Sequence, residues 1–87
     1  MLKYYIMNEK ELNCLILEVL KHKFSCAQEI MQVLAEKKLN FEMQKFYPTL
    51  SQLQLKNYLC TNWLKNNQGQ NVKYYHITKN GYNYIHK

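Results

Sequence analysis

The sequence contains no arginine and no aspartate, only two glycines and one proline, and no apolar run longer than four residues. The scarcity of glycine and proline argues against a flexible linker or a low-complexity tail. The longest apolar runs, Tyr4–Met7 and Cys14–Leu17, are too short for a transmembrane helix or a signal peptide. We therefore expect a cytoplasmic protein with no membrane contact, and 87 residues allow a single domain over 1–87.

The sequence also lacks the residue patterns of a metal site or an active site. Cys14, Cys26 and Cys60 contain no C-x-x-C pair, and the set Cys14, His22 and Cys26 matches no common ligand spacing. We expect the cysteines to be reduced, small buried apolar side chains. The histidines have no partner carboxylate or nucleophile, and no Gly-rich phosphate loop occurs. These absences indicate a protein that is not an enzyme and needs no metal or cofactor.

Acidic residues are missing from the second half of the chain. Residues 1–42 contain six lysines and six glutamates, whereas 43–87 contain six lysines and no acid, which places the net charge of +6 there. A surface of one sign attracts polyanions. Asn and Gln, seventeen in all, pair well with adenine, whereas the Arg that most often reads guanine is absent. We expect A·T-rich double-stranded DNA as the partner; a merely solvated basic face and an A+T-rich genome are the alternatives.

Capping signals and helical periodicity predict three helices in the first two thirds of the chain, over 9–22, 26–38 and 42–57. The predicted caps are Asn8 with Glu11, Ser25 with Gln28, and Asn40. The third helix has an apolar stripe that should be buried, formed by Met43, Phe46, Leu50 and Leu53. Pro48 should bend this helix or fray its first turn, and Asn57 can take the left-handed conformation that stops it.

The remaining chain changes from helical to alternating periodicity. Residues 58–64 and 72–77 are rich in β-branched and aromatic residues and flank the turn-like segment 65–70, which predicts a hairpin. We expect its Trp63, Tyr75 and Ile77 to belong to the core. Thr78 then caps a short last helix. The predicted fold is mainly α with a two-stranded β-hairpin (α+β), in the order α-α-α-β-β-α of a winged helix-turn-helix.

Two blocks of this sequence resemble the PadR family of bacterial transcriptional regulators. That family has Tyr-Pro and then Leu-x-x-Leu in its recognition helix, and a strand Lys-Tyr-Tyr-x-Leu-Thr-x-x-Gly after its wing. The matching positions are Tyr47, Pro48, Leu50, Leu53, Lys73, Tyr74, Tyr75, Thr78 and Gly81, with Ile77 in place of Leu. Asn57 and Val72 depart from the usual Gly and basic residue. Members continue into a long C-terminal dimerisation helix, so the end at Lys87 predicts a short form without it.

A winged helix places its third helix in the major groove and its hairpin on the flanking backbone or minor groove. The expected contacts of the recognition helix are Gln44, Lys45, Tyr47, Thr49, Gln52 and Lys56. Those of the wing are Lys65, Asn66, Asn67, Gln68, Gln70 and Lys73. A solvated helix face, a polar hairpin tip and a packed Tyr47 are the alternatives.

The N-terminal arm, 1–7, is apolar, and Cys14 and Leu17 are apolar residues on the second face of the first helix; together they predict a subunit contact. The expected dimer interface is Leu2, Tyr4, Tyr5, Ile6, Leu17, Tyr82 and Ile85. The leading hypothesis is a homodimeric DNA-binding transcriptional regulator that recognises an inverted repeat. The alternatives are a centromere-binding adaptor of a plasmid or phage partition system, which recruits a filament-forming protein, and a winged helix used only for protein contacts.

Overall fold

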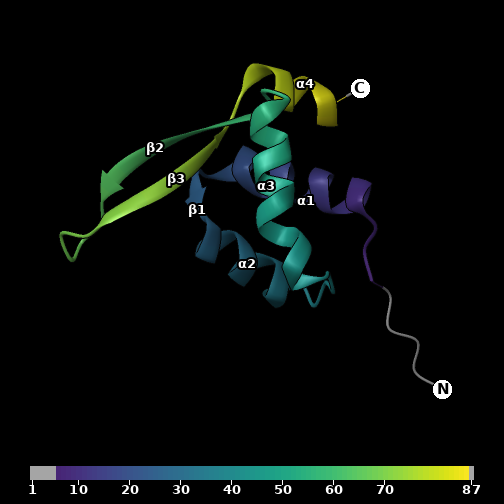
Figure 1. Cartoon of the computed structure of the whole chain (residues 1–87), viewed down its shortest axis with the longest axis horizontal. Coiled ribbons are helices and arrows are strands. Elements are labelled where there is room, and N and C mark those ends of the chain that lie inside the picture. The colour runs from purple at the N-terminus through teal and green to yellow at the C-terminus, as the bar shows by residue number, and fades with distance from the viewer. Residues whose placement is uncertain (1–5, 87) are drawn as a thin grey trace.

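The computed structural model describes residues 6–86, which form four helices and one three-stranded antiparallel sheet (Figure 1). The helices are α1 (Glu9–His22), α2 (Ala27–Glu36), α3 (Met43–Leu55) and α4 (Lys79–Ile85). The strands are β1 (Ser25–Cys26), β2 (Leu59–Lys65) and β3 (Asn71–Ile77), in the sheet order β1-β3-β2. The α+β winged-helix prediction is therefore confirmed, with one strand added. No helix within this described part is long and apolar enough to cross a membrane.

Local capping chemistry places the ends of three helices as predicted. At α1, the Glu11 amide donates to Asn8 Oδ1 (2.8 Å) and the Asn8 amide donates to Glu11 Oε1 (3.2 Å). At α4, the Gly81 amide donates to Thr78 Oγ1 (3.0 Å). Asn57 ends α3 with a left-handed φ of 62°, which lets the Tyr58 amide reach back to an α3 carbonyl. Each of these interactions spans few residues, which is why the sequence reveals them.

The start of α2 differs from the prediction because Ser25 is part of a strand. Ser25 and Cys26 pair with Tyr75 and Tyr74 of β3, which a two-residue segment does not signal in the sequence. The Ser25 hydroxyl donates to the Lys23 carbonyl (3.1 Å) instead of capping α2. The predicted Ser25–Gln28 capping box is thus wrong; Glu29 Oε1 accepts the Cys26 amide (3.0 Å) in its place. The helix also ends at Glu36 rather than at 38.

The start of α3 was also wrongly predicted. The Asn40 carbonyl accepts the Met7 amide (2.9 Å), so Asn40 ties the N-terminal segment to the domain and does not cap α3. Glu42 occupies the N-cap position and makes no capping bond with its side chain. Met43, the first helical residue, is 58 % exposed instead of buried. Residues 43–55 remain helical through Pro48.

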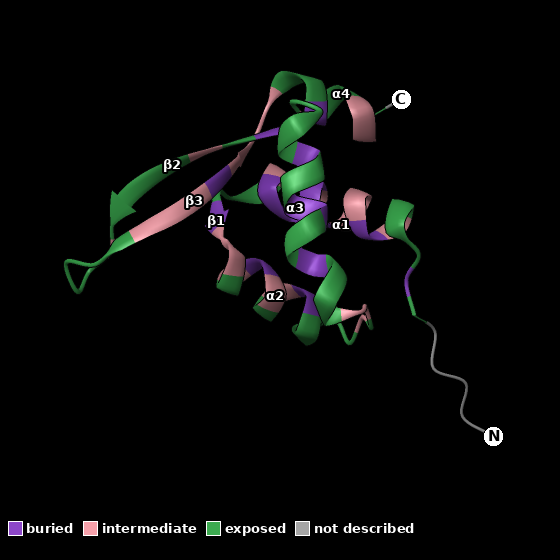
Figure 2. Ribbon diagram, in the orientation of Figure 1, coloured by how far each residue is buried: buried purple, intermediate pink, exposed green. Residues whose placement is uncertain are grey.

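The core lies where α1, α2 and α3 meet the sheet (Figure 2). Its fully buried side chains are Ile16, Leu17, Ile30, Leu34, Phe46, Leu50, Leu53 and Leu59. Tyr75 is buried and Ile77 packs against the core, as predicted. Trp63, expected in the core, is 66 % exposed because the hairpin extends beyond the helices (Figure 1). Cys60 is exposed as well, so only Cys14 and Cys26 are partly buried thiols.

Candidate nucleic-acid interface

The most exposed side of α3, called the crest below, does not coincide with the side of the helix that carries most of the predicted DNA contacts. Phe46, Thr49, Leu50 and Leu53 face the core. With 3.6 residues per turn, the side most distant from them carries Gln44, Pro48, Ser51 and Leu55, all of which are exposed. The predicted contacts Lys45 and Gln52 flank one edge of this crest, Tyr47 flanks the other, and Lys56 follows the helix; these four are also exposed.

Thr49 does not belong to the outer surface of α3. It is only 5 % exposed, and its hydroxyl donates to the Lys45 carbonyl at 2.6 Å. Because Pro48 has no amide hydrogen for the Gln44 carbonyl, this region of the helix combines a missing backbone bond with an added side-chain bond. The prediction of a groove contact from Thr49 is therefore wrong. Ser51 takes its place as the small hydroxyl residue on the exposed crest.

The beginning of α3 holds an acidic side chain among the predicted DNA contacts. Glu42 Oε1 lies 3.3 Å from Lys45 Nζ, and Glu42 Oε2 accepts a bond from Gln44 Nε2 at 3.3 Å. Both partners of the ion pair are well exposed, so water screens the attraction. Glu42 is nonetheless the acid that contacts Lys45 and Gln44, and Glu9 of α1 lines one pocket together with Glu42, Lys45 and Gln52. Sequence analysis missed the role of Glu42 because it lies just outside the acid-free segment.

The hairpin tip is organised by one asparagine. Asn66 Oδ1 accepts the amides of Gln68 and Gln70, both at 2.9 Å, and Asn66 Nδ2 donates to Gln70 Oε1 at 3.2 Å. Gly69 completes the turn with a left-handed φ of 77°. Asn66 therefore serves the turn, and its carbonyl oxygen is already occupied. Lys65, Asn67, Gln68 and Gln70 are exposed around it.

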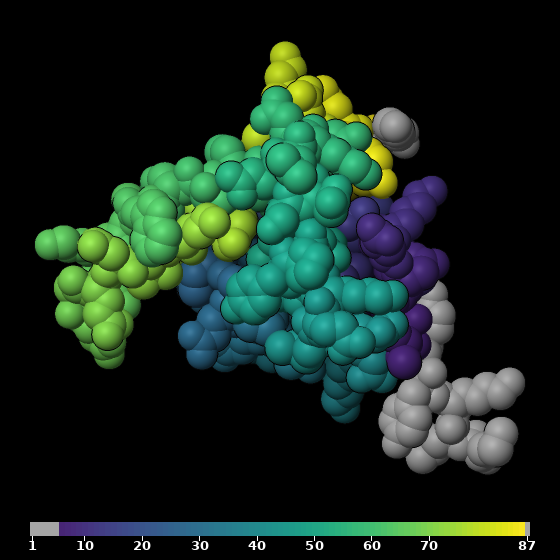
Figure 3. Space-filling model, in the orientation of Figure 1, coloured from purple at the N-terminus to yellow at the C-terminus, as the bar shows by residue number. Residues whose placement is uncertain are grey.

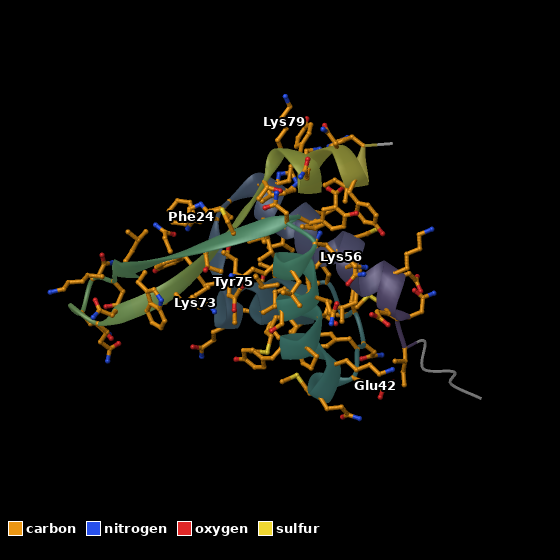
Figure 4. All side chains as sticks on the ribbon, turned by 45° about the horizontal axis from the view of Figure 1, so that its top comes forward. Phe24, Glu42, Lys56, Lys73, Tyr75 and Lys79 are labelled. Atoms are coloured by element: carbon orange, nitrogen blue, oxygen red, sulfur yellow. The ribbon has the colours of Figure 1, made fainter. Side chains whose placement is uncertain are left out.

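Lys73, Tyr75 and Tyr47 connect the wing with α3. Lys73 Nζ lies over the Tyr75 ring, 5.5 Å from its centroid. Burial raises the pKa of the Tyr75 phenol above its usual range, and the nearby Tyr47 phenol raises it further. Figure 4 shows Lys73 and Tyr75 on one side of the strands and Phe24 on the other. The side that carries Lys73 is thus the side of the sheet that packs toward the helices.

Helix α3 and the wing, the β2–β3 hairpin, present one basic surface. Figure 3 shows α3 and the β2–β3 hairpin exposed on the same face of the molecule. Lys45, Lys56, Lys65 and Lys73 come from these elements, whereas five of the six glutamates lie on α1 and α2. Such an arrangement attracts a polyanion to this face. Within residues 6–86, no three His, Cys or Glu side chains are grouped so that they could hold a metal ion.

The sequence was compared with known proteins. A family model described as the transcriptional regulator PadR-like family matches residues 16–87, which is most of the chain. The chain belongs to the PadR-like family. This membership confirms the resemblance of the two sequence blocks and makes the protein a transcriptional regulator rather than an enzyme. No curated protein matches the sequence significantly.

Solved structures agree with this assignment. A PadR-like transcription factor from Bacteroides fragilis is 28 % identical, with a TM-score of 0.78 over 90 % of this chain and 76 % of that one. A protein from Streptococcus mutans UA159 is 28 % identical, with a TM-score of 0.83 over 95 % of this chain and 76 % of that one. A PadR family regulator from Clostridium difficile R20291, at 22 % identity, shares the fold with a TM-score of 0.78 over 86 % and 79 %. The family match favours a regulator over a partition adaptor.

The predicted dimer contacts of this PadR-like chain have three different outcomes. Leu17 is fully buried within its own core, so the prediction of an exposed subunit contact there is wrong. Ile6 and Tyr82 are 53 % and 46 % exposed, and Ile85 is partly buried against the core. The remaining members, Leu2, Tyr4 and Tyr5, lie outside the described residues. Met7, at the end of the predicted arm, is buried in the core.

Proposed function

We propose that this PadR-like regulator binds A·T-rich duplex DNA as a homodimer, with α3 in the major groove and the wing on the flanking backbone. The observation that carries this proposal is the shared basic face of α3 and the hairpin, where residues 43–86 contribute lysines and no acid. Attraction to phosphates supplies most of the affinity of such a surface without reading sequence. Sequence must then be read by side chains on the exposed crest.

The crest of α3 and its edge suit base contacts because Gln44, Ser51 and Gln52 supply two amides and a hydroxyl there. A major groove about 12 Å wide admits one helix and distinguishes all four base pairs. Gln44 and Gln52 would read base edges, with adenine as the preferred bidentate partner, and Ser51 would read either type of edge. Lys45 and Lys56, at the two ends of the helix, would bind phosphates and fix its depth in the groove.

The wing is suited to contact the DNA backbone beside the major groove that α3 would enter. Lys65 and Lys73 supply charge near its two ends, and Asn67, Gln68 and Gln70 supply amides around the tip. Asn66 contributes through the turn that it holds rather than through a DNA contact. In the wing, Asn66 thus holds the turn while the other side chains would contact phosphates. Because phosphate contacts carry no direct sequence information, the wing would bind with low sequence preference.

A homodimer would place two α3 helices in successive major grooves. A two-fold axis gives an inverted repeat with half-sites about 34 Å apart. The exposed Tyr82 offers apolar surface on α4 for such an interface. We assign the exposed Ile6 and the other arm residues Leu2, Tyr4 and Tyr5 to the same proposed interface. Lys21 Nζ lies 5.6 Å from the centroid of the Tyr82 ring, so this surface has a cationic border.

Selection from random duplexes tests the proposal. Protein-bound duplexes should yield an A·T-rich inverted repeat whose half-site centres are about one helical turn apart. Light scattering of the free protein should give twice the monomer mass. An array of direct repeats would instead support the partition adaptor. A selection without enrichment, together with a monomer in solution, would contradict both the sequence reading and the dimer.

A further inference from the structure

Trp63 is the only tryptophan of the chain, and 66 % of its surface is exposed. It lies on β2 opposite Lys73 of β3. Among the aromatic contacts within residues 6–86, none involves Trp63. Leaving so large an apolar side chain in water forgoes the free energy that its burial would supply. Packing in the core therefore does not account for a tryptophan at this position, although the sequence pattern predicts one.

The register of the hairpin fixes the side on which Trp63 lies. Side chains alternate along a strand, so Leu59, Thr61 and Trp63 share one face of β2. Leu59 and Tyr75, which is paired with Thr61, belong to the core on that face. Trp63 therefore lies on the side of the sheet that packs against the helices, and its exposure agrees with a hairpin that extends beyond them (Figure 1).

The surroundings of Trp63 indicate the chemistry of what covers it. Lys73 is its cross-strand neighbour, Lys65 lies two residues further on the same face, and residues 43–86 contain no acid. This combination favours a polyanion with apolar parts over a cationic or purely apolar surface. An indole has an apolar ring and one N–H donor. A sugar–phosphate backbone presents both an apolar sugar and an acceptor oxygen.

We propose that Trp63 is a DNA-contact residue of the wing, whose ring packs on a deoxyribose while its Nε1–H donates to a phosphate oxygen. This inference rests on the proposed function, and it adds a non-ionic anchor to a wing that otherwise relies on charge. Lys73 provides the ionic part of the same contact. The two residues differ in how salt affects them, because only the ionic part releases counterions.

Intrinsic fluorescence tests the contact directly, because Trp63 is the single source of tryptophan emission. Duplex DNA is added while binding is followed independently by anisotropy of a dye on the DNA. Binding should shift the Trp63 emission and reduce its quenching by acrylamide. Binding by anisotropy with unchanged emission and unchanged quenching would overturn the inference while the proposed function stands. If no duplex binds, the proposed function fails and the inference fails with it.

Variants separate the parts of the contact. Trp63→Ala should weaken duplex binding roughly tenfold with an unchanged salt slope, and Trp63→Phe, which keeps a ring but no N–H, about threefold. Lys73→Gln should reduce the salt slope by about 1 per protomer. Leu64→Ala is the matched control, because Leu64 is the next residue, 39 % exposed, on the opposite face. Equal losses for Trp63→Ala and Leu64→Ala would overturn the inference, since they would report damage to the hairpin. Emission of the free protein that changes with its concentration would also overturn it, by indicating a contact between copies.

Discussion

The ammonium group of Lys45, in the first turn of α3, lies 3.3 Å from Oε1 of Glu42, which immediately precedes that helix. Glu42 also accepts the side-chain amide of Gln44, so one carboxylate engages two of the proposed DNA contacts. A carboxylate at this place repels phosphates and competes with them for Lys45. If Lys45 binds a phosphate as proposed, it must exchange Glu42 for that phosphate, and we expect Glu42 to limit the affinity of the basic face.

Glu42→Gln should strengthen binding to mixed-sequence duplexes by up to about fivefold at low salt, because an exposed ion pair is worth at most about 1 kcal/mol. Fluorescence anisotropy measures this change. Glu36→Gln removes the same charge from the pocket that α1 and α2 line together, and should change affinity less. Weaker binding by Glu42→Gln would contradict this role and would indicate that the carboxylate itself reads a cytosine amino group.

Gln52→Ala should relax base preference at one position of each half-site, with a loss of about 1–3 kcal/mol on the preferred sequence. The reason is that a bidentate amide contact discriminates among bases, whereas lysine contacts with phosphate do not. Competition between the selected duplex and its single-base variants measures the effect. Gln32→Ala on α2 is the control. An equal loss on all sequences would place Gln52 on the backbone instead.

Gly81→Ala should destabilise the fold by about 2–3 kcal/mol, because overpacking forces the backbone to move. A Cβ at Gly81 would lie 2.0 Å from the Tyr58 carbonyl oxygen, where α4 leaves the sheet. Gly69→Ala is the informative comparison: its φ of 77° is strained for alanine, yet nothing lies within 4 Å, so about 1 kcal/mol is expected. The midpoints of denaturant unfolding rank the stabilities of the two variants. A smaller loss of stability for Gly81→Ala than for Gly69→Ala would refute the close approach of Gly81 to the Tyr58 carbonyl.

Tyr75→Phe should make the protein less sensitive to alkaline pH. Burial raises the folded-state pKa of Tyr75, so its neutral form favours folding. The stability this provides is complete below the unfolded pKa of about 10 and is lost as pH rises through the folded value. Thermal unfolding between neutral and strongly alkaline pH should show a smaller fall for Tyr75→Phe than for the parent. Parallel curves would show that Tyr75 ionises equally well in both states.

Features that depend on neighbouring residues were predictable from the sequence. The Asn8–Glu11 capping box, the Thr78 cap and the left-handed Asn57 each join groups a few residues apart. Helical and alternating periodicity similarly indicated the order of the main elements. The same local reasoning identified the acid-free segment, from which α3 and the hairpin form the candidate surface.

Features that depend on distant contacts were not predictable. Strand β1 exists only because Ser25 and Cys26 pair with β3, and Leu17 is buried only because the completed fold surrounds it. Trp63 is a large apolar residue of the kind usually found in a core, but it is exposed on a hairpin that extends beyond the helices. The orientation of α3 about its own axis, which hides Thr49 and exposes Ser51, is set by packing and not by its polar pattern.

The salt dependence of duplex binding tests the central claim most directly, because that claim is that α3 and the wing together grip DNA phosphates. A plot of log affinity against log salt should be linear, with a slope of about −3 to −5 per protomer and twice that for the dimer, at about −0.9 per phosphate contacted. Replacing Lys45 or Lys73 should each reduce that slope by about 1 per protomer. A protein that leaves both mixed-sequence and selected duplexes unbound at low salt, or binds them with no salt dependence, would contradict the account.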